Sequence, residues 1–265
     1  MTVAILLPAR LASSRLPHKL LLDRSGKTVL EHTIDRAKEA QAASEGMISR
    51  IIVAADCRSL MTVADNAGVE SVLTDPKHAS GTDRIAEAAC RINDEIIVNL
   101  QADEPEIDPA SILLVAKLLT APGESASMAT LAEPIFDAET FQKSNVVKVV
   151  ASASGYALYF SRAPIPFLRD AGTAQLCQMD GKPVYGLHHI GIYAYRRAFL
   201  LLYKNLPCSK LEELEKLEQL RALEAGYAIK LGMVKNSPLG IDTAEDYEAF
   251  IKRMAVSGKN TRSAR

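Results

Sequence analysis

The first hundred residues alternate between apolar runs typical of buried strands and segments typical of helices. The apolar runs lie at residues 3–7, 50–55, 69–73 and 95–100, and the helical segments lie at residues 28–42, 60–67 and 81–91. This alternation predicts an α/β fold with a mostly parallel sheet and helices on both faces, since parallel neighbours need a crossover between them. Ligands of such sheets bind beyond the carboxyl ends of the strands, so we expect Arg10, Asp56 and Asp103 at one edge.

Local signals predict where several of these helices begin and end. Thr28 precedes the first helix, and Glu31 three residues later completes a capping box. Gly68 is a helix stop. The helix at residues 81–91 is expected to start from Thr82 or Asp83 as its cap.

The second half of the chain is less regular. We expect strands at residues 127–131, 145–150, 157–160 and 189–195 that extend the same sheet. Residues 170–183 are polar and contain glycine and proline, which predicts a mobile loop. Residues 257–265 are expected to form a flexible tail.

A leucine-rich segment at residues 210–225 predicts a helix with a broad apolar surface. Its leucines recur every third residue, a spacing that drifts around a helix by about 60° per step. Four polar side chains lie opposite these leucines, and a solvent-exposed face is the favoured interpretation of Glu212, Glu215, Glu218 and Gln219.

Composition limits the classes of function that fit the chain. Its 265 residues carry a formal net charge of −1, with a pI of about 6.5. This balance argues against a general nucleic-acid surface, so a polyanion would have to meet a local cluster of cations. No apolar run approaches the length of a membrane span, no secretory signal is visible, and four cysteines are scattered without metal-ligand spacing. We therefore expect a soluble protein of the cytoplasm.

The loop after the first apolar run has the character of a cradle for a triphosphate. Pro8 is expected to end the hydrogen-bonding ladder of the strand, and small residues after it let backbone N–H groups approach an anion. Arg10, Arg15 and Lys19 would supply the positive charge. The alternative is a solvated basic loop.

Two carboxylates predict a magnesium site near that cradle. Asp103 follows the strand at residues 95–100, and Asp242 precedes the last helix. Mg²⁺ commonly takes one or two carboxylates together with substrate phosphates. Asp242 could equally be the N-cap of the following helix, whereas Asp108 before Pro109 is a better cap than Asp103 for the helix that follows it.

Three further stretches carry polar groups suited to ligand binding. The loop at residues 77–84 feeds a helix and could present backbone N–H groups to a base edge or a phosphate, or could simply cap that helix. Arg162 lies in a proline-stiffened apolar segment and suits a carboxylate. His188 and His189 are adjacent on a strand, so they face opposite sides of it.

Taken together, these motifs resemble the 3-deoxy-manno-octulosonate (KDO) cytidylyltransferase family, the CMP-KDO synthetases. The resemblance runs from about residue 3 to residue 250, and the matching stretches are residues 7–10, 13–17 with Lys19, 78–84, 99–105, 146–150, 159–166, 189–193, 217–221 and 242–243.

The resemblance implies a Rossmann-like nucleotidyltransferase sheet with a smaller C-terminal extension for sugar binding and dimerisation. It implies one domain over residues 1–256, with residues 1–125 mainly for the nucleotide and residues 126–256 mainly for the sugar and a homodimer contact. The implied reaction is attack of the anomeric hydroxyl of KDO on the α-phosphorus of CTP, which yields CMP-KDO for lipopolysaccharide biosynthesis and releases pyrophosphate.

Site residues follow from the same resemblance. Arg10, Arg15 and Lys19 would hold the triphosphate, and Asp103 and Asp242 would bind Mg²⁺, so that Arg10, Lys19, Asp103 and Asp242 form the catalytic set. Cytosine would be read by Leu7, Pro8, Ala9, Ala79, Ser80 and Gly81, with Arg84 nearby. KDO would be held by Gln101, Arg162, His189, Tyr193, Glu218 and Gln219.

Four positions depart from the family pattern. His18 and Ala102 stand where the family usually has glycine, Leu20 stands where it usually has proline, and His188 stands where it often has arginine. These departures leave two alternatives open: a related nucleotidyltransferase acting on 8-amino-KDO or another sugar acid, and a nucleotide-binding module without catalytic activity. Arg162 favours a sugar that carries a carboxylate, and the retention of both Asp103 and Asp242 argues against the non-catalytic module.

Overall fold

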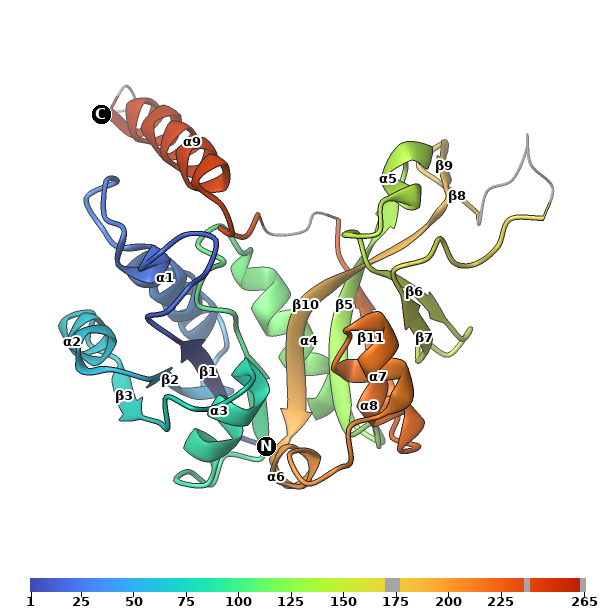
Figure 1. Ribbon diagram of the computed structural model, residues 1–265, viewed down its shortest axis with the longest axis horizontal. Helices are drawn as coiled ribbons and strands as arrows, with labels where there is room; N and C mark the ends of the chain where they lie inside the picture. The colour runs from blue at the N-terminus through green and yellow to red at the C-terminus, as the bar shows by residue number, and fades with distance from the viewer. Residues whose placement is uncertain (170–176, 236–238, 263–265) are drawn as a thin grey trace. The chain divides into compact units, whose positions relative to one another are not determined.

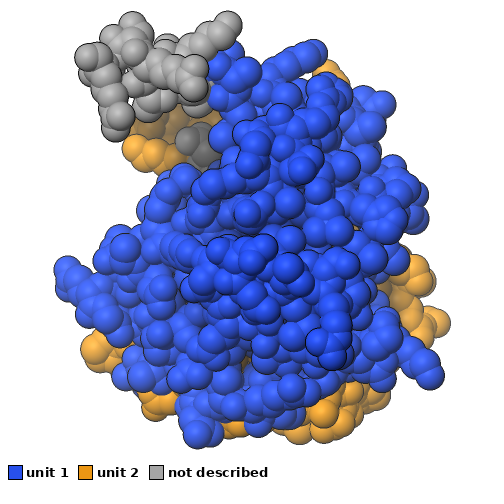
Figure 2. Space-filling model, turned by 90° about the vertical axis from the view of Figure 1, so that its left-hand side faces the viewer, with its two compact units in different colours: residues 1–94, 99–113, 238–265 blue, residues 95–98, 114–237 orange. Residues whose placement is uncertain are grey.

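A computed structural model describes residues 1–169, 177–235 and 239–262, without the side chains of residues 257–262. The chain forms two compact units (Figure 2). Unit 1 comprises residues 1–94, 99–113 and 238–265, and unit 2 comprises residues 95–98 and 114–237. The C-terminal segment, residues 238–265, belongs with the N-terminal unit.

Unit 1 is built on three parallel strands, β1 (Val3–Ala9), β2 (Ile48–Ala55) and β3 (Glu70–Leu73) (Figure 1). The side chains of β1 are almost entirely buried, as its apolar sequence predicts. The unit contains η1 (Lys19–Leu21), α1 (Val29–Ala42), α2 (Arg58–Asn66), α3 (Gly81–Ala89) and α9 (Ala244–Arg262), and α4 (Pro109–Thr120) begins in it.

The prediction that Pro8 ends the ladder of the first strand is wrong. β1 continues through Pro8 to Ala9, and these two residues pair with Ala54 and Ala55 of β2. The backbone of Leu6 faces away from β2, since its carbonyl accepts from Leu100 N–H at 3.1 Å. Backbone groups alternate along a strand, so the missing N–H of Pro8 lies on that same side and leaves the β1–β2 ladder intact.

The predicted start of α1 and the predicted end of α2 are confirmed, whereas the predicted cap of α3 is wrong. Thr28 caps α1, and the capping box with Glu31 is complete, which confirms that prediction. Gly68 follows α2 with a φ of 69°, as a helix stop requires. The cap of α3 is Ser80, whose hydroxyl accepts from Asp83 N–H at 3.1 Å, and not Thr82 or Asp83. Ser80 has extended backbone geometry, whereas the next residues are already helical.

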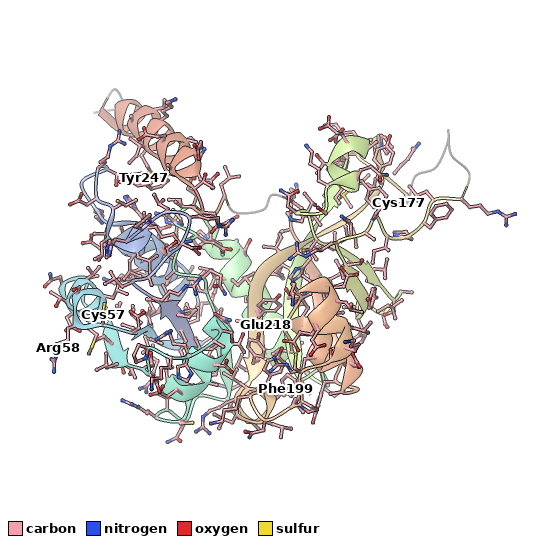
Figure 3. The ribbon with its side chains drawn as sticks, in the orientation of Figure 1. Cys57, Arg58, Cys177, Phe199, Glu218 and Tyr247 are labelled. Carbon is pink, nitrogen blue, oxygen red and sulfur yellow. The ribbon has the colours of Figure 1, made fainter. Side chains whose placement is uncertain are left out.

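Helix α9 returns the chain to unit 1. Tyr247, labelled in Figure 3, accepts from Arg24 N–H at 2.9 Å through its hydroxyl. Phe250 packs edge-on against His32 of α1, with the ring centroids 5.2 Å apart. The helix includes residues 257–262 of the expected flexible tail, and residues 263–265 lie outside the described part of the chain.

Unit 2 holds a mixed sheet whose neighbouring strands follow the order β11–β5–β10–β4, with β6 beside β10 and β7 beside β6. β5 is antiparallel to β10 and parallel to β11, while β6 is antiparallel to both β10 and β7. The strands are β4 (Ile96–Asn99), β5 (Met128–Ile135), β6 (Lys148–Ala151), β7 (Ala157–Ser161), β10 (Gly186–Arg196) and β11 (Ile229–Met233).

The remaining elements of unit 2 are short. They include α5 (Ala138–Gln142), α6 (Arg197–Tyr203), and a hairpin of β8 (Cys177–Met179) and β9 (Lys182–Val184). The hairpin covers part of the expected mobile loop, and residues 170–176 of that loop lie outside the described residues. Within the described residues, no helix combines the length and apolar character needed to cross a membrane.

The single helix expected at residues 210–225 is broken in two, α7 (Lys210–Glu215) and α8 (Gln219–Glu224). Lys216 ends α7 in the left-handed conformation, with a φ of 54°. The carbonyls of Glu215 and Lys216 accept from the guanidinium of Arg162. A tertiary partner for the last carbonyls of α7 thus overrides the local helix propensity.

Candidate functional site

The cationic loop of unit 1 lines a cavity of about 490 Å³. Its lining residues are Arg10, Leu11, Ala12, Ser13, Ser14, Pro17 and His18. The loop leaves β1 and is anchored by Asp56, whose carboxylate oxygens accept from Leu11 N–H at 3.0 and 3.2 Å. Small side chains and one exposed arginine around a cavity of this size suit an extended anion.

Asp103 and Asp242 converge on the ammonium of Lys19. Lys19 Nζ contacts Asp103 Oδ2, lies 3.1 Å from Asp242 Oδ1, and donates to the carbonyl of Ile241 at 2.9 Å. Arg15 Nη2 lies 2.9 Å from Asp242 Oδ2. The structure therefore brings together two of the three predicted phosphate-binding cations and both predicted metal ligands.

The structure decides between the two interpretations of Asp242. The N-cap of α9 is Thr243, whose hydroxyl accepts from Asp246 N–H at 3.2 Å. Asp246 completes the cap, since its carboxylate accepts from the backbone N–H groups of Asp242 and Thr243. The Asp242 carboxylate is thus not used as a cap and faces Lys19 and Arg15 instead.

Asp103 and Asp242 present carboxylate oxygens, the ligand type that Mg²⁺ prefers in proteins. Glu104 Oε2 is buried, and no hydrogen-bond partner for it is found among the described residues. Burial and the neighbouring Asp103 carboxylate raise the pKa of Glu104 to about 8. A second negative charge beside Asp103 is therefore unfavourable unless a cation compensates it. The described residues contain no group of three or more His, Cys, Asp or Glu side chains able to hold a metal ion by themselves. Mg²⁺ commonly takes only one or two carboxylates, and phosphate oxygens of the substrate supply the other ligands.

The Ser80 loop lies against the end of β1. A Cβ atom added to Gly81 would meet Pro8 Cγ at 3.3 Å and Gln101 Oε1 at 3.9 Å. Arg84 is 3% exposed, and its Nη1 donates to Thr74 Oγ1 at 2.6 Å. The predicted cytosine-reading residues Leu7, Pro8, Ala9, Ala79, Ser80 and Gly81 therefore belong to neighbouring segments of one unit.

Backbone geometry distinguishes two of the departures from the family pattern, because His18 is strained and Ala102 is not. His18 has a φ of 56° and a ψ of 27°, a left-handed conformation in which glycine is unstrained. Ala102 is not one of the described residues that have a positive φ. Its carbonyl accepts from Thr33 Oγ1 at 3.0 Å. Alanine at position 102 therefore needs no backbone strain.

Replacing His18 with glycine should raise the free energy of unfolding by about 0.5–1 kcal/mol, because it removes the strain of a left-handed β-carbon. Urea denaturation of the wild type and H18G measures this effect. Ala12→Gly, in the same loop but without a positive φ, should instead lower the stability by about 0.4–1 kcal/mol. Equal effects of both variants would contradict the assignment of strain to His18.

Arg162 lies in unit 2 with much of its guanidinium already bonded. Its Nε donates to Glu215 O at 2.7 Å, and its Nη1 and Nη2 donate to Ser144 O and Lys216 O at 3.2 and 3.5 Å. Three of the five N–H groups that an arginine carries are thus used, and one remains on each terminal nitrogen. Among the described residues, each terminal nitrogen of Arg162 thus keeps one N–H group for which no partner is found.

His188 and His189 face opposite sides of β10, as predicted. His188 Nδ1 lies 2.9 Å from Glu133 Oε1, and these two residues are direct partners across β10 and β5. His189 is 7% exposed, and its Nε2 lies 3.0 Å from Thr130 Oγ1. Its ring packs edge-on against Phe160 at 4.9 Å and lies 5.5 Å from the ring of Tyr193.

The expected solvent-exposed face of residues 212–219 is wrong for most of its members. Glu212 is 8% exposed and forms a bidentate pair with Arg221, at 2.5 and 2.7 Å. Glu215 accepts from Ser161 Oγ at 2.6 Å. Gln219 is 3% exposed, and no partner for its buried Nε2 is found among the described residues. Glu218 precedes α8 (Figure 3), and its carbonyl accepts from a tyrosine hydroxyl.

His189 should make the folded protein sensitive to acid. Burial, with a smaller effect of His188, lowers the pKa of His189 to about 3, whereas the unfolded chain binds this proton near pH 6.5. The unfolded state therefore binds more protons between these pH values, and stability falls as the pH falls from 6.5 toward 3, by up to about 1.4 kcal/mol per pH unit. Urea denaturation at pH 7, 5 and 4 should give a shallower loss for His189→Gln, and parallel losses would contradict this role.

Sequence reasoning missed two buried polar residues of unit 2. Lys148 is 0% exposed, and its Nζ donates to three backbone carbonyls, those of Lys143, Val146 and Arg162, at 2.6–2.8 Å. Thr130, also 0% exposed, contacts His189. Each is a single polar residue inside an apolar run. This pattern is the sequence feature that could have indicated a buried polar side chain.

Comparisons with known proteins agree with this arrangement. A family described as cytidylyltransferase matches residues 4–231. A 3-deoxy-manno-octulosonate cytidylyltransferase of Rhodopirellula baltica is 47% identical over 255 residues, which cover 96% of this chain and 99% of that protein. Its counterpart from Acidovorax ebreus is 46% identical over 92% of this chain and 94% of its own length.

Solved structures give a consistent result. The structure of a CMP:2-keto-3-deoxy-manno-octonic acid synthetase complexed with CTP matches with a TM-score of 0.87 and 35% identity, over 97% of this chain and all of that chain. A cytidylyltransferase from Leptospira borgpetersenii matches with a TM-score of 0.59 and 18% identity, over 99% of this chain and 96% of its own, which shows a shared fold.

Proposed function

The chain belongs to the cytidylyltransferase family, and on that premise we propose that it transfers the cytidylyl group of CTP to KDO, forming CMP-KDO and pyrophosphate. The observation that carries this proposal is the convergence of Asp103 and Asp242 on Lys19, at the end of the cationic loop. The names and coverage of its relatives support the same activity.

In this proposal unit 1 binds CTP. The cavity beside Arg10 accepts the triphosphate, and Arg15 and Lys19 neutralise its charge and that of the departing pyrophosphate. The backbone at Leu7, Pro8 and Ala9 and the loop at Ala79, Ser80 and Gly81 read cytosine, with Arg84 beside them. Transfer needs in-line positioning and charge neutralisation rather than a protein nucleophile.

Asp103 and Asp242 would hold Mg²⁺ together with phosphate oxygens, and the convergence of both carboxylates on Lys19 supports this role. When bound, the ion reduces repulsion between the anionic substrates and acidifies the attacking hydroxyl. Lys19 lies between the two carboxylates and holds them in place before substrate binds. Once CTP is bound, the triphosphate is a further anionic partner for the Lys19 ammonium.

The sugar acid is assigned mainly to unit 2. Arg162 offers one N–H from each terminal nitrogen, a pair that matches the two oxygens of a carboxylate. The buried amide of Gln219 and the ring of His189, beside Tyr193, suit the hydroxyl groups of a sugar. Glu218 completes the set proposed for unit 2. We further propose that the enzyme acts in the cytoplasm as a homodimer, as the family resemblance implies.

His188 favours one alternative acceptor. Where the family often has arginine, this chain places an imidazole bonded to Glu133, so a modified sugar acid such as 8-amino-KDO is the second candidate. A non-catalytic nucleotide-binding module is the third, and it would bind CTP without turnover.

A pyrophosphate-release assay distinguishes these candidates. CTP, UTP, ATP and GTP are each combined with KDO, 8-amino-KDO or N-acetylneuraminate, with and without Mg²⁺. We expect release only with CTP, Mg²⁺ and KDO. Preference for 8-amino-KDO would select the second candidate, and no release with CTP and any sugar acid would refute the enzymatic function.

A further inference from the structure

The antiparallel pair of β5 and β10 contains a bulge at the proposed sugar-acid residues. Ile190 pairs with Leu131, but the next paired residue of β10 is Tyr193, opposite Thr130. Gly191 and Ile192 are therefore extra residues on β10. Bulges interrupt the ladder and redirect side chains.

This bulge brings His189 and Tyr193 together. The two residues are four positions apart, a separation of roughly 13 Å along a regular strand. Their partners on β5, Ala132 and Thr130, are only two positions apart, and the rings of His189 and Tyr193 lie 5.5 Å from each other. The pairing register also keeps both side chains on one face of the sheet.

The hydroxyl of Thr130 bonds the backbone of the bulge. Thr130 Oγ1 lies 3.0 Å from Ile190 O and 2.8 Å from Ile192 O, and the residue is fully buried. Carbonyls at a bulge lose regular ladder partners, and a buried carbonyl needs a donor. The carbonyls of Ile190 and Ile192 share the single hydroxyl proton of Thr130 as their donor.

The same hydroxyl determines which ring nitrogen of His189 carries a proton. With its own proton directed to the two carbonyls, Thr130 Oγ1 is an acceptor toward His189 Nε2, 3.0 Å away. His189 then carries its proton on Nε2, and its Nδ1 presents a lone pair. A lone pair at Nδ1 accepts a hydrogen bond from a sugar hydroxyl.

We propose that Thr130 is a positioning residue for the sugar acid, which holds the β10 bulge and fixes His189 as the Nε2–H tautomer. The part of this proposal that concerns the sugar acid rests on the proposed function. Thr130 acts through His189 and Tyr193, since its buried hydroxyl is occupied by the protein's own groups.

Steady-state kinetics of T130V and T130S test the positioning. Valine keeps the shape of threonine without the hydroxyl, and serine keeps the hydroxyl. We expect T130V to raise the KM for KDO about tenfold while the KM for CTP changes less than about twofold, and we expect T130S to restore most of the wild-type value. An unchanged KM for KDO in T130V, or equal rises for both substrates, would overturn the positioning role.

Ile229→Val is the matched control for lost stability. Ile229 is fully buried in β11, which pairs with β5 on the side opposite β10. Truncation there should lower stability without raising the KM for KDO selectively. A selective rise in this control as large as in T130V would mean that general loosening, and not the hydroxyl, explains the effect.

The tautomer is tested without any activity measurement. Two-bond ¹⁵N–¹H spectra of the wild type at pH 7, with His189 assigned by the signal missing in His189→Gln, should show the Nε2–H form. The Nδ1–H form would overturn the proposal even if T130V does not fold. If the wild type releases no pyrophosphate from CTP and KDO, the proposed function fails, and this spectrum still decides the hydrogen-bond arrangement.

Discussion

Replacing Asp103 with asparagine should lower kcat/KM for pyrophosphate release from CTP and KDO by about a hundredfold or more. Asp103 is one of two carboxylates that converge on Lys19, and an amide is a much poorer ligand for Mg²⁺. The side chain is 28% exposed, so the isosteric change should leave the fold intact. Pyrophosphate release at saturating Mg²⁺ gives the rate, and circular dichroism checks folding.

Binding of CTP separates loss of the metal site from loss of the nucleotide site. D103N removes a negative charge near the proposed phosphate site, so calorimetry in metal-free buffer should show CTP affinity equal to or higher than that of the wild type. Asp108→Asn is the matched control, because Asp108 is exposed in the same segment and caps Ala110 N–H at 2.9 Å, a role that asparagine also fills. Wild-type turnover by D103N, or an equal loss in the control, would refute the metal-binding role.

Replacing Lys148 with methionine should lower the free energy of unfolding by about 3 kcal/mol or more, with a fall in Tm of roughly 6–12 °C. The ammonium of Lys148 donates to the carbonyls of Lys143, Val146 and Arg162, and methionine would leave these carbonyls without that donor. Burial lowers the pKa of Lys148, yet three acceptors surround its charge. Differential scanning calorimetry measures the shift.

Lys143→Met makes the same chemical change nearby. The Lys143 ammonium pairs with exposed Glu139 at 3.1 Å, an ion pair whose loss should change stability by less than about 0.5 kcal/mol. K148M should also raise the KM for KDO more than that for CTP, because Lys148 holds the carbonyl of Arg162. A Tm for K148M within 2 °C of the control would show that the three hydrogen bonds contribute little.

Local sequence signals identified most of the regular elements. The alternation of apolar and helical segments predicted β1 to β4 and α1 to α3. For β1, β2 and β4 the reason is that burial of a strand on both faces leaves a continuous apolar run, which is visible without knowledge of its partners. The capping box of Thr28 and Glu31 spans one turn of α1, so it was visible in the sequence alone.

Predictions failed where a distant residue determined local structure. Residues 210–225 form two helices because Arg162 binds the carbonyls of Glu215 and Lys216, a competition that helix propensity does not include. Of the carboxylates expected to be solvent-exposed, Glu212 pairs with Arg221 across the break between α7 and α8, and Glu215 accepts from the distant Ser161 of β7.

The sequence by itself indicated the family, most strands and helices and the charged residues of the candidate site, since these depend on residue type and local order. Only the tertiary structure decided how those residues are used. Asp242 is free to face Lys19 because Thr243 and Asp246 cap α9. His189 contacts Tyr193 because a bulge in β10 brings these two residues closer together along the strand. Hydrogen bonds between segments far apart in the chain set these arrangements, and such bonds leave no periodic trace in the sequence.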